Sequence, residues 1–194
     1  RLAAVRSPVW EAAQPEQREI FASNVAALAR AGALVEPVEL PAPFAQAHAA
    51  QRAIMGYEGA RSLAAVQREH RERLSARLNA FLDEGARVGE ARYREALATR
   101  ARLAETFARF MNRFDAVVTP PAKGEAPATL EETGDPVFCT LWTLLGAPAL
   151  SIPVGLGPQG LPLGLQIVGA PGRDAAALAA AAWCEAQLPF AGLP

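Results

Sequence analysis

Three patterns of apolar and polar residues follow one another along the chain, and the first predicts a strand, a helix and a strand. Residues 2–5 form a short apolar run, and residues 33–40 are rich in residue types that favour strands. Between them, over residues 20–28, apolar side chains recur at the spacing of a helix face. A connection of this length suits a right-handed crossover between parallel strands, so residues 1–40 predict one unit of an α/β sheet.

Helical periodicity dominates residues 41–114. The clearest apolar stripe belongs to the last helix of this segment, where Glu90 and Arg94 also stand four residues apart and can form an ion pair. The apolar members of the stripe are Tyr93, Leu97, Leu103, Ala104, Phe107, Phe110, Met111 and Phe114. We therefore expect a helical segment whose last helix is buried along one face.

The last segment, residues 115–194, mixes strands and helices. Compact apolar runs predict strands at residues 115–119, 149–155 and 163–169, the last two joined by a turn rich in glycine and proline. Helical patterns are present at residues 136–145 and 174–188. The three segments together predict a single α/β domain, with a mixed sheet and helices packed on it.

The charge balance of the chain argues against nucleic acid and membranes as partners. The 19 Lys and Arg residues nearly cancel the 20 Asp and Glu residues, and the formal net charge of −1 does not favour nucleic acid or an anionic membrane. Residues 136–172 contain no charged residue, as a membrane span would, but prolines and glycines would interrupt any helix there. We expect neither a nucleic-acid nor a membrane partner, and interpret the charge-free stretch as short, deeply buried elements.

Cysteine and histidine usage points to an intracellular protein without a metal. Cys139 and Cys184 are the only cysteines, so a disulfide-rich secreted scaffold is excluded and a cytoplasmic location is expected. His48 and His70 have no cysteine or carboxylate around them at the spacing of metal ligands, so no metal site is predicted.

The remaining candidates for chemistry have ordinary structural explanations. The G-x-G-x-x-G pattern of residues 155–160 is followed by a strand pattern and not by the helix that a pyrophosphate site needs, so we expect a hairpin and no cofactor. Ser151 lies in a strand, outside any G-x-S-x-G turn, and Lys123 lies on a loop. For Cys139 a buried structural role is favoured, since the sequence brings no histidine to it. The residues alone therefore give no catalytic set.

Four motifs stand in a distinctive order in the last third of the chain. They are Asp-Ala-Val-Val-Thr-Pro-Pro at residues 115–121, Thr-Gly-Asp-Pro-Val-Phe at 133–138, Leu-Leu-Gly-Ala-Pro-Ala-Leu-Ser-Ile-Pro at 144–153 and Gly-Leu-Pro-Leu-Gly-Leu-Gln-Ile-Val-Gly at 160–169. Together they resemble the C-terminal portion of the amidase signature family. The resemblance implies carboxamide hydrolysis by a Ser–cis-Ser–Lys triad. In the family this triad lies upstream, on a lysine segment and a Gly-Ser-Ser-Gly-Gly stretch that these 194 residues lack, so no catalytic residue is assigned.

The resemblance also implies which residues border the substrate. In the family, the helix before the third motif and the strand of the fourth motif come close to the acyl side of the substrate. Phe138, Cys139, Trp142 and Ile167 would supply an apolar lining, and Gln166 would hydrogen-bond a polar substrate group. The alternative is that Phe138, Trp142 and Ile167 are core residues.

The expected function is therefore that of the C-terminal part of an amidase-type hydrolase, which acts on a small-molecule amide together with a catalytic part that this chain lacks. The chain begins with Arg1 and not with Met, so we expect further sequence upstream. Two alternatives stay open: a non-catalytic binding domain that kept the fold, and part of a glutaminase-type amidotransferase subunit. Because a fragment would expose a sheet edge and apolar surface, self-association is expected.

Overall fold

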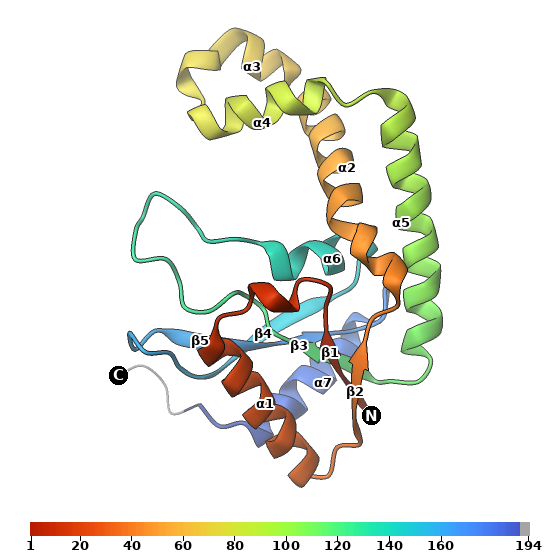
Figure 1. The fold of residues 1–194 in the computed structure, drawn as a ribbon, viewed down its shortest axis with the longest axis vertical. Coiled ribbons are helices and arrows are strands. Elements are labelled where there is room, and N and C mark those ends of the chain that lie inside the picture. The colour runs from red at the N-terminus through yellow and green to blue at the C-terminus, as the bar shows by residue number, and fades with distance from the viewer. Residues whose placement is uncertain (191–194) are drawn as a thin grey trace.

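The computed structural model describes residues 1–190, which fold around a five-stranded sheet (Figure 1). Its strands are β1 (Leu2–Arg6), β2 (Val35–Glu39), β3 (Ala116–Thr119), β4 (Ala149–Leu156) and β5 (Pro162–Val168). They lie in the order β2-β1-β3-β5-β4; β1 runs parallel to β2 and β3, whereas β5 is antiparallel to β3 and β4. The predicted α/β fold with a mixed sheet is confirmed.

The first unit has the predicted strand, helix and strand. The helix α1 (Pro15–Arg30) connects the parallel strands β1 and β2. Pro15 lies in the first turn of the helix, where backbone N–H groups have no acceptor within the helix, so the lack of an N–H in proline costs no hydrogen bond. Gly32 follows the end of the helix with a φ of +104°, a left-handed conformation that glycine adopts without strain. Both ends of the helix are therefore set by local sequence.

Residues 41–114 form a helical arm that rises from one side of the sheet (Figure 1). Its helices are α2 (Ala47–Ser62), α3 (Ala64–His70), α4 (Ala76–Ala86) and α5 (Glu90–Met111). Short 3₁₀ helices occur at Trp10–Ala12, Ala42–Gln46 and Arg71–Arg73. The long helices α2 and α5 pack side by side, and α3 and α4 lie at their far ends. Leu103, Phe107 and Met111 bury the predicted stripe of α5.

The sheet separates two apolar cores. The two remaining helices are α6 (Val137–Leu145) and α7 (Asp174–Gln187). Helices α2, α5 and α6 cover one face, where Trp142 and Val168 are buried, and α1 and α7 cover the other, where Ile167 and Cys184 are buried. Burial raises the pKa of the Cys184 thiol to about 11, as for a structural cysteine. The register of each strand therefore decides which core a residue joins.

The charge-free stretch, residues 136–172, folds into α6, β4, β5 and their connections. Gly146 ends α6 in a left-handed conformation, with a φ of +63°, and the strand pair β4–β5 follows. Among residues 1–190, no helix has both the length and the apolar character that crossing a membrane would require.

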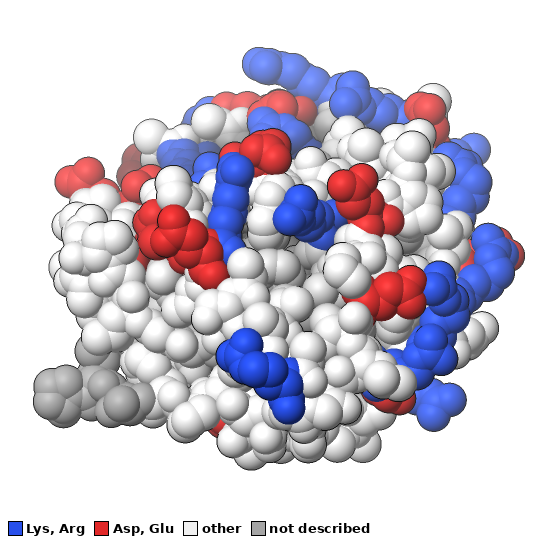
Figure 2. Space-filling view, turned by 60° about the horizontal axis from the view of Figure 1, so that its bottom comes forward, with Lys and Arg blue, Asp and Glu red and all other residues white. Residues whose placement is uncertain are grey.

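Charged side chains are distributed unevenly over the surface. In Figure 2 they are spread over the upper half and the right side of the face, whereas its lower left part is mostly uncharged. On the helical arm, basic residues alternate with acidic partners, as in the ion pairs Arg94–Glu90 and Arg52–Glu84. Arginine side chains and carboxylates are therefore interleaved on the surface of the arm.

The helices α2 and α4 approach each other at two glycines. A Cβ atom on Gly85 would lie 2.2 Å from the backbone oxygen of Gly56 and 3.0 Å from its Cα atom. These distances are too short for any side chain, so the approach requires glycine at position 85. It brings the fully buried Leu82 of α4 against α2.

We expect the substitution Gly85→Ala to lower the free energy of unfolding by about 1–3 kcal/mol, because the added methyl group must push α4 away from α2. Urea unfolding followed by circular dichroism measures the change. The control is Gly89→Ser, directly before α5, where the new side chain enters open space and its hydroxyl can cap the helix. We expect unchanged or higher stability for this control. Wild-type stability of Gly85→Ala would contradict the close approach.

Candidate functional site

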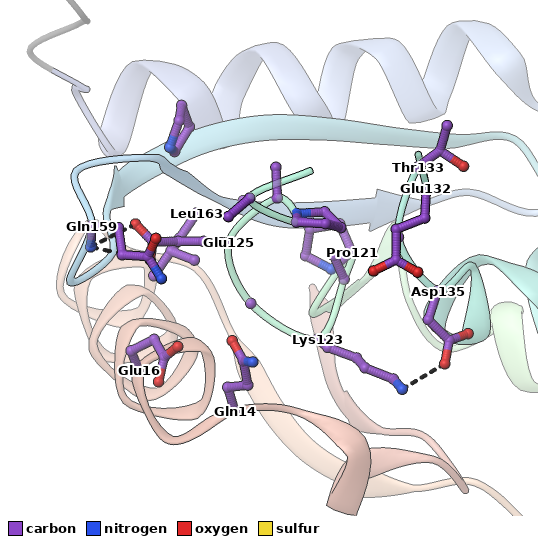
Figure 3. Close-up of a pocket in the computed structure, with 18 of the residues that line it drawn as sticks. Gln14, Glu16, Pro121, Lys123, Glu125, Glu132, Thr133, Asp135, Gln159 and Leu163 are labelled. Atoms are coloured by element: carbon purple, nitrogen blue, oxygen red, sulfur yellow. Dashed lines mark hydrogen bonds and ion pairs between the residues drawn. The ribbon is translucent and has the colours of Figure 1, made fainter. Parts of the chain in front are cut away.

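A cavity of about 1200 Å³ opens beside β4 and β5 (Figure 3). Ser151, Pro153 and Gly164 of these strands form its floor. One wall is the 120–136 loop, which joins β3 to α6, and another is the 157–161 turn, which joins β4 to β5. A volume of this size is ample for a small organic ligand.

An ion pair joins the two ends of the 120–136 loop. The Lys123 Nζ atom lies 2.5 Å from Asp135 Oδ2, as Figure 3 shows. The hydrogen bond from Lys123 holds the pKa of Asp135 below its usual value. The other oxygen of Asp135 accepts the N–H of Val137, the first residue of α6, at 3.0 Å. Lys123 is thus the ion-pair partner of Asp135.

A second carboxylate connects the loop to the opposite wall. Glu125 accepts the backbone N–H of Gln159 at 3.0 and 3.1 Å and that of Leu161 at 2.8 Å. Gly157 lies directly against the same carboxylate. Gly157 and Gln159 belong to the G-x-G-x-x-G pattern of residues 155–160, and Leu161 follows it. As predicted, this segment is the hairpin connection between β4 and β5.

Two of the residues expected to border a substrate are in contact near the cavity. Gln166 Nε2 lies 3.8 Å from Cys139 Sγ, which in turn donates to the Pro121 carbonyl oxygen at 3.5 Å. Gln166 is only 4% exposed, and its Oε1 atom has no hydrogen-bond partner among the described residues. Ser151 lies opposite Gln166 in the β4–β5 register, so the two side chains share a face of the sheet.

The other three expected lining residues are buried in the protein interior. Phe138 is 2% exposed and Trp142 is 1% exposed, and the Trp142 ring lies 5.7 Å from the Phe107 ring of α5. Ile167 is fully buried on the opposite face of the sheet, in the core beneath α1 and α7. Successive strand residues face opposite sides, so Ile167 cannot line the same surface as Gln166. For Ile167 the core alternative fits its placement.

The sequence does not reveal the charged residues of the cavity. Lys123 is on a loop, as expected, but its pairing with Asp135 spans 12 residues and has no local signal. Ser151 is a strand residue, as expected, and its exposed side lies on the cavity floor. Among residues 1–190, no hydrogen bond joins Ser151 to Lys123, so the two do not form a nucleophile and base.

The histidines and cysteines of the described chain do not form a metal centre. Within residues 1–190, no group of three His, Cys, Asp or Glu side chains is arranged to hold a metal ion. The His48 Nε2 atom instead lies 2.8 Å from the Val137 carbonyl oxygen at the start of α6.

Comparisons with known proteins agree on one family. The amidase family model matches residues 1–178. A glutamyl-tRNA(Gln) amidotransferase subunit of Rhizorhabdus wittichii is 38% identical over 112 residues, which are 54% of this chain and 23% of that protein. A crystal structure of an amidase superposes with a TM-score of 0.84 at 29% identity, over 96% of this chain and 45% of the other. A bacterial aryl acylamidase of the amidase signature family shares the fold, with a TM-score of 0.75 at 23% identity, over 100% of this chain and 46% of the other.

The chain spans less than half the length of each of these relatives. The family match nevertheless extends through all five strands of the sheet and into the last helix. The chain therefore belongs to the amidase family.

Proposed function

We propose that this chain is the C-terminal part of an amidase-type hydrolase and that it forms one wall of the pocket for a small amide substrate. The family match over residues 1–178 carries the proposal. The solved amidase that superposes on nearly all of this chain is more than twice as long, which leaves room for a catalytic part outside these residues. In the proposed enzyme, that part supplies the nucleophilic serine, the bridging serine and the lysine.

The chemistry of the residues beside the cavity supports a role in binding. Gln166 lies next to the cavity, opposite Ser151 of its floor. Gln166 is a neutral amide, so it can accept an N–H from an amide substrate but cannot remove a proton in the reaction. Lys123 forms an ion pair with Asp135, and the five serines of the chain include no adjacent pair. A wall of this composition would position a substrate whose carbonyl is attacked from elsewhere.

We expect the purified 194-residue chain to release no ammonia from simple amides such as propionamide and benzamide, because it lacks a nucleophile paired with a base. The measurement is a coupled ammonia assay, with circular dichroism to confirm folding. Turnover that disappears in Ser151→Ala or Lys123→Ala would overturn the proposal.

A second experiment separates binding residues from core residues. We expect Gln166→Met to change the free energy of unfolding by less than about 1 kcal/mol, because it removes a buried acceptor that has no partner among the described residues. The matched substitution Ile167→Ala, one residue away on the other face, should cost about 2–5 kcal/mol through the cavity it leaves. Equal losses in the two variants would assign Gln166 a purely structural role.

A glutaminase-type amidotransferase subunit is the second candidate. The most specific observation in its favour is the 38% identity to the glutamyl-tRNA(Gln) amidotransferase protein of Rhizorhabdus wittichii. The two candidates predict different substrates for the full-length protein, which would release ammonia from glutamine in one case and from other amides in the other. A coding sequence upstream of Arg1 without a Gly-Ser-Ser-Gly-Gly stretch would instead favour a non-catalytic binding domain. A cytoplasmic location belongs to the same proposal and is supported by two free cysteines.

We also expect the isolated chain to self-associate. The β4 strand is an edge of the sheet, with Ser151 and Pro153 exposed along it. Leu34 and Trp183, which are 70% and 39% exposed, border a separate hollow of about 440 Å³. Size-exclusion chromatography with light scattering should show a mass that rises with protein concentration. A monomer of 20.5 kDa throughout would contradict this expectation.

A further inference from the structure

The 157–161 turn holds a carboxylate in the manner of an anion-binding site. Two of its backbone N–H groups, those of Gln159 and Leu161, point at Glu125, and no side chain of the turn takes part in these bonds. Hydrogen bonds from N–H groups to a carboxylate are charge-assisted and stronger than those between neutral groups. Converging backbone N–H groups are a recurrent way of binding anions.

The shape of the turn also fits a carboxylate. A Cβ atom on Gly157 would lie 2.4 Å from Glu125 Cδ and 2.6 Å from its Oε1 atom. The missing side chain at this position therefore makes the space that the carboxylate occupies. The φ of Gly157 lies outside the left-handed region, so the need for glycine here comes from the carboxylate and not from the backbone.

The same carboxylate determines where the 120–136 loop lies. Along this loop, Lys123 is bonded through its carbonyl oxygen to the Gln14 N–H at 2.6 Å and through its ammonium to Asp135. Both contacts hold the ends of the loop, whereas the Glu125 carboxylate bonds it to the β4–β5 side of the cavity (Figure 3). Without this carboxylate, the loop and the turn would be two independent walls.

We propose that the Gln159 and Leu161 N–H groups form a carboxylate-binding site, which Glu125 occupies as an internal ligand to fasten the 120–136 loop across the cavity. Removal of Glu125 frees the site for a small external carboxylate and lets the loop move away from the turn. The inference rests on these contacts and does not depend on whether the chain takes part in amide hydrolysis.

The test uses the 194-residue chain and formate as the external carboxylate. In Glu125→Ala, we expect amide hydrogen exchange at Gln159 and Leu161 to be about 10- to 100-fold faster than in the wild type, because both N–H groups lose their charge-assisted acceptor. Added formate should shift the NMR signals of the Gln159 and Leu161 amides saturably in this variant. It should not shift them in the wild type, where Glu125 fills the site. Sodium chloride at equal ionic strength controls for salt.

Two further variants make the test specific. Glu132→Ala removes a carboxylate of the same loop that has no hydrogen bond or ion pair among the described residues, and it should leave exchange and formate response at wild-type values. Gly157→Ala keeps Glu125 but forces its carboxylate out of the site, so exchange of the Gln159 and Leu161 amides should rise as in Glu125→Ala. Gly157→Ala therefore still tests the carboxylate-binding site if Glu125→Ala does not fold.

Three results would overturn the proposal. They are formate shifts of equal size in wild type and Glu125→Ala, unchanged exchange of the Gln159 and Leu161 amides in both Glu125→Ala and Gly157→Ala, and equal effects of Glu132→Ala and Glu125→Ala. An absence of amidase activity in any of these proteins leaves the result unaffected, so failure here is distinct from failure of the proposed function.

Discussion

Burial of the central strands on both faces is the constraint from which the rest of the structure follows. Strands β1 and β3 have almost no exposed side chain, and β5 is exposed only at its first residues. A strand covered on both faces must supply apolar residues to two cores at once. Successive residues face opposite sides of the sheet, so the position of a residue in the strand determines which core it enters. In β5 this places Leu165 and Ile167 beneath α1 and α7, and Val168 beneath α6.

The placement of the candidate site is a consequence of this arrangement. Helix α6 is anchored by Leu141 and Trp142, which pack into the core shared with α5. The first turn of the helix therefore lies over β5, and Cys139 meets Gln166 there. The 120–136 loop, which joins β3 to α6, lies beside β4 and β5 and lines the cavity with them. The loop thereby encloses the cavity.

Local signals predicted the elements, but not how the elements combine into a site. The α1 crossover, the α5 stripe and the 155–160 hairpin connection each follow from residues close together in the chain, and all are present. The family resemblance identified Cys139 and Gln166, which do meet. It also included Ile167, which strand alternation places on the other face. Contacts of Glu125 reach 34 and 36 residues along the chain, so no local pattern could indicate them.

Two charged side chains of the cavity wall, Lys123 and Glu125, are engaged in contacts within the protein. Asp135 neutralises Lys123, and two backbone N–H groups satisfy Glu125, so these groups are committed to holding the loop. Gln166 differs, because its Oε1 atom is buried and has no partner among the described residues. An unpaired buried acceptor costs stability unless something donates to it. In the proposed function, the N–H of an amide substrate would supply that donor, and substrate binding would offset the cost of the unpaired acceptor.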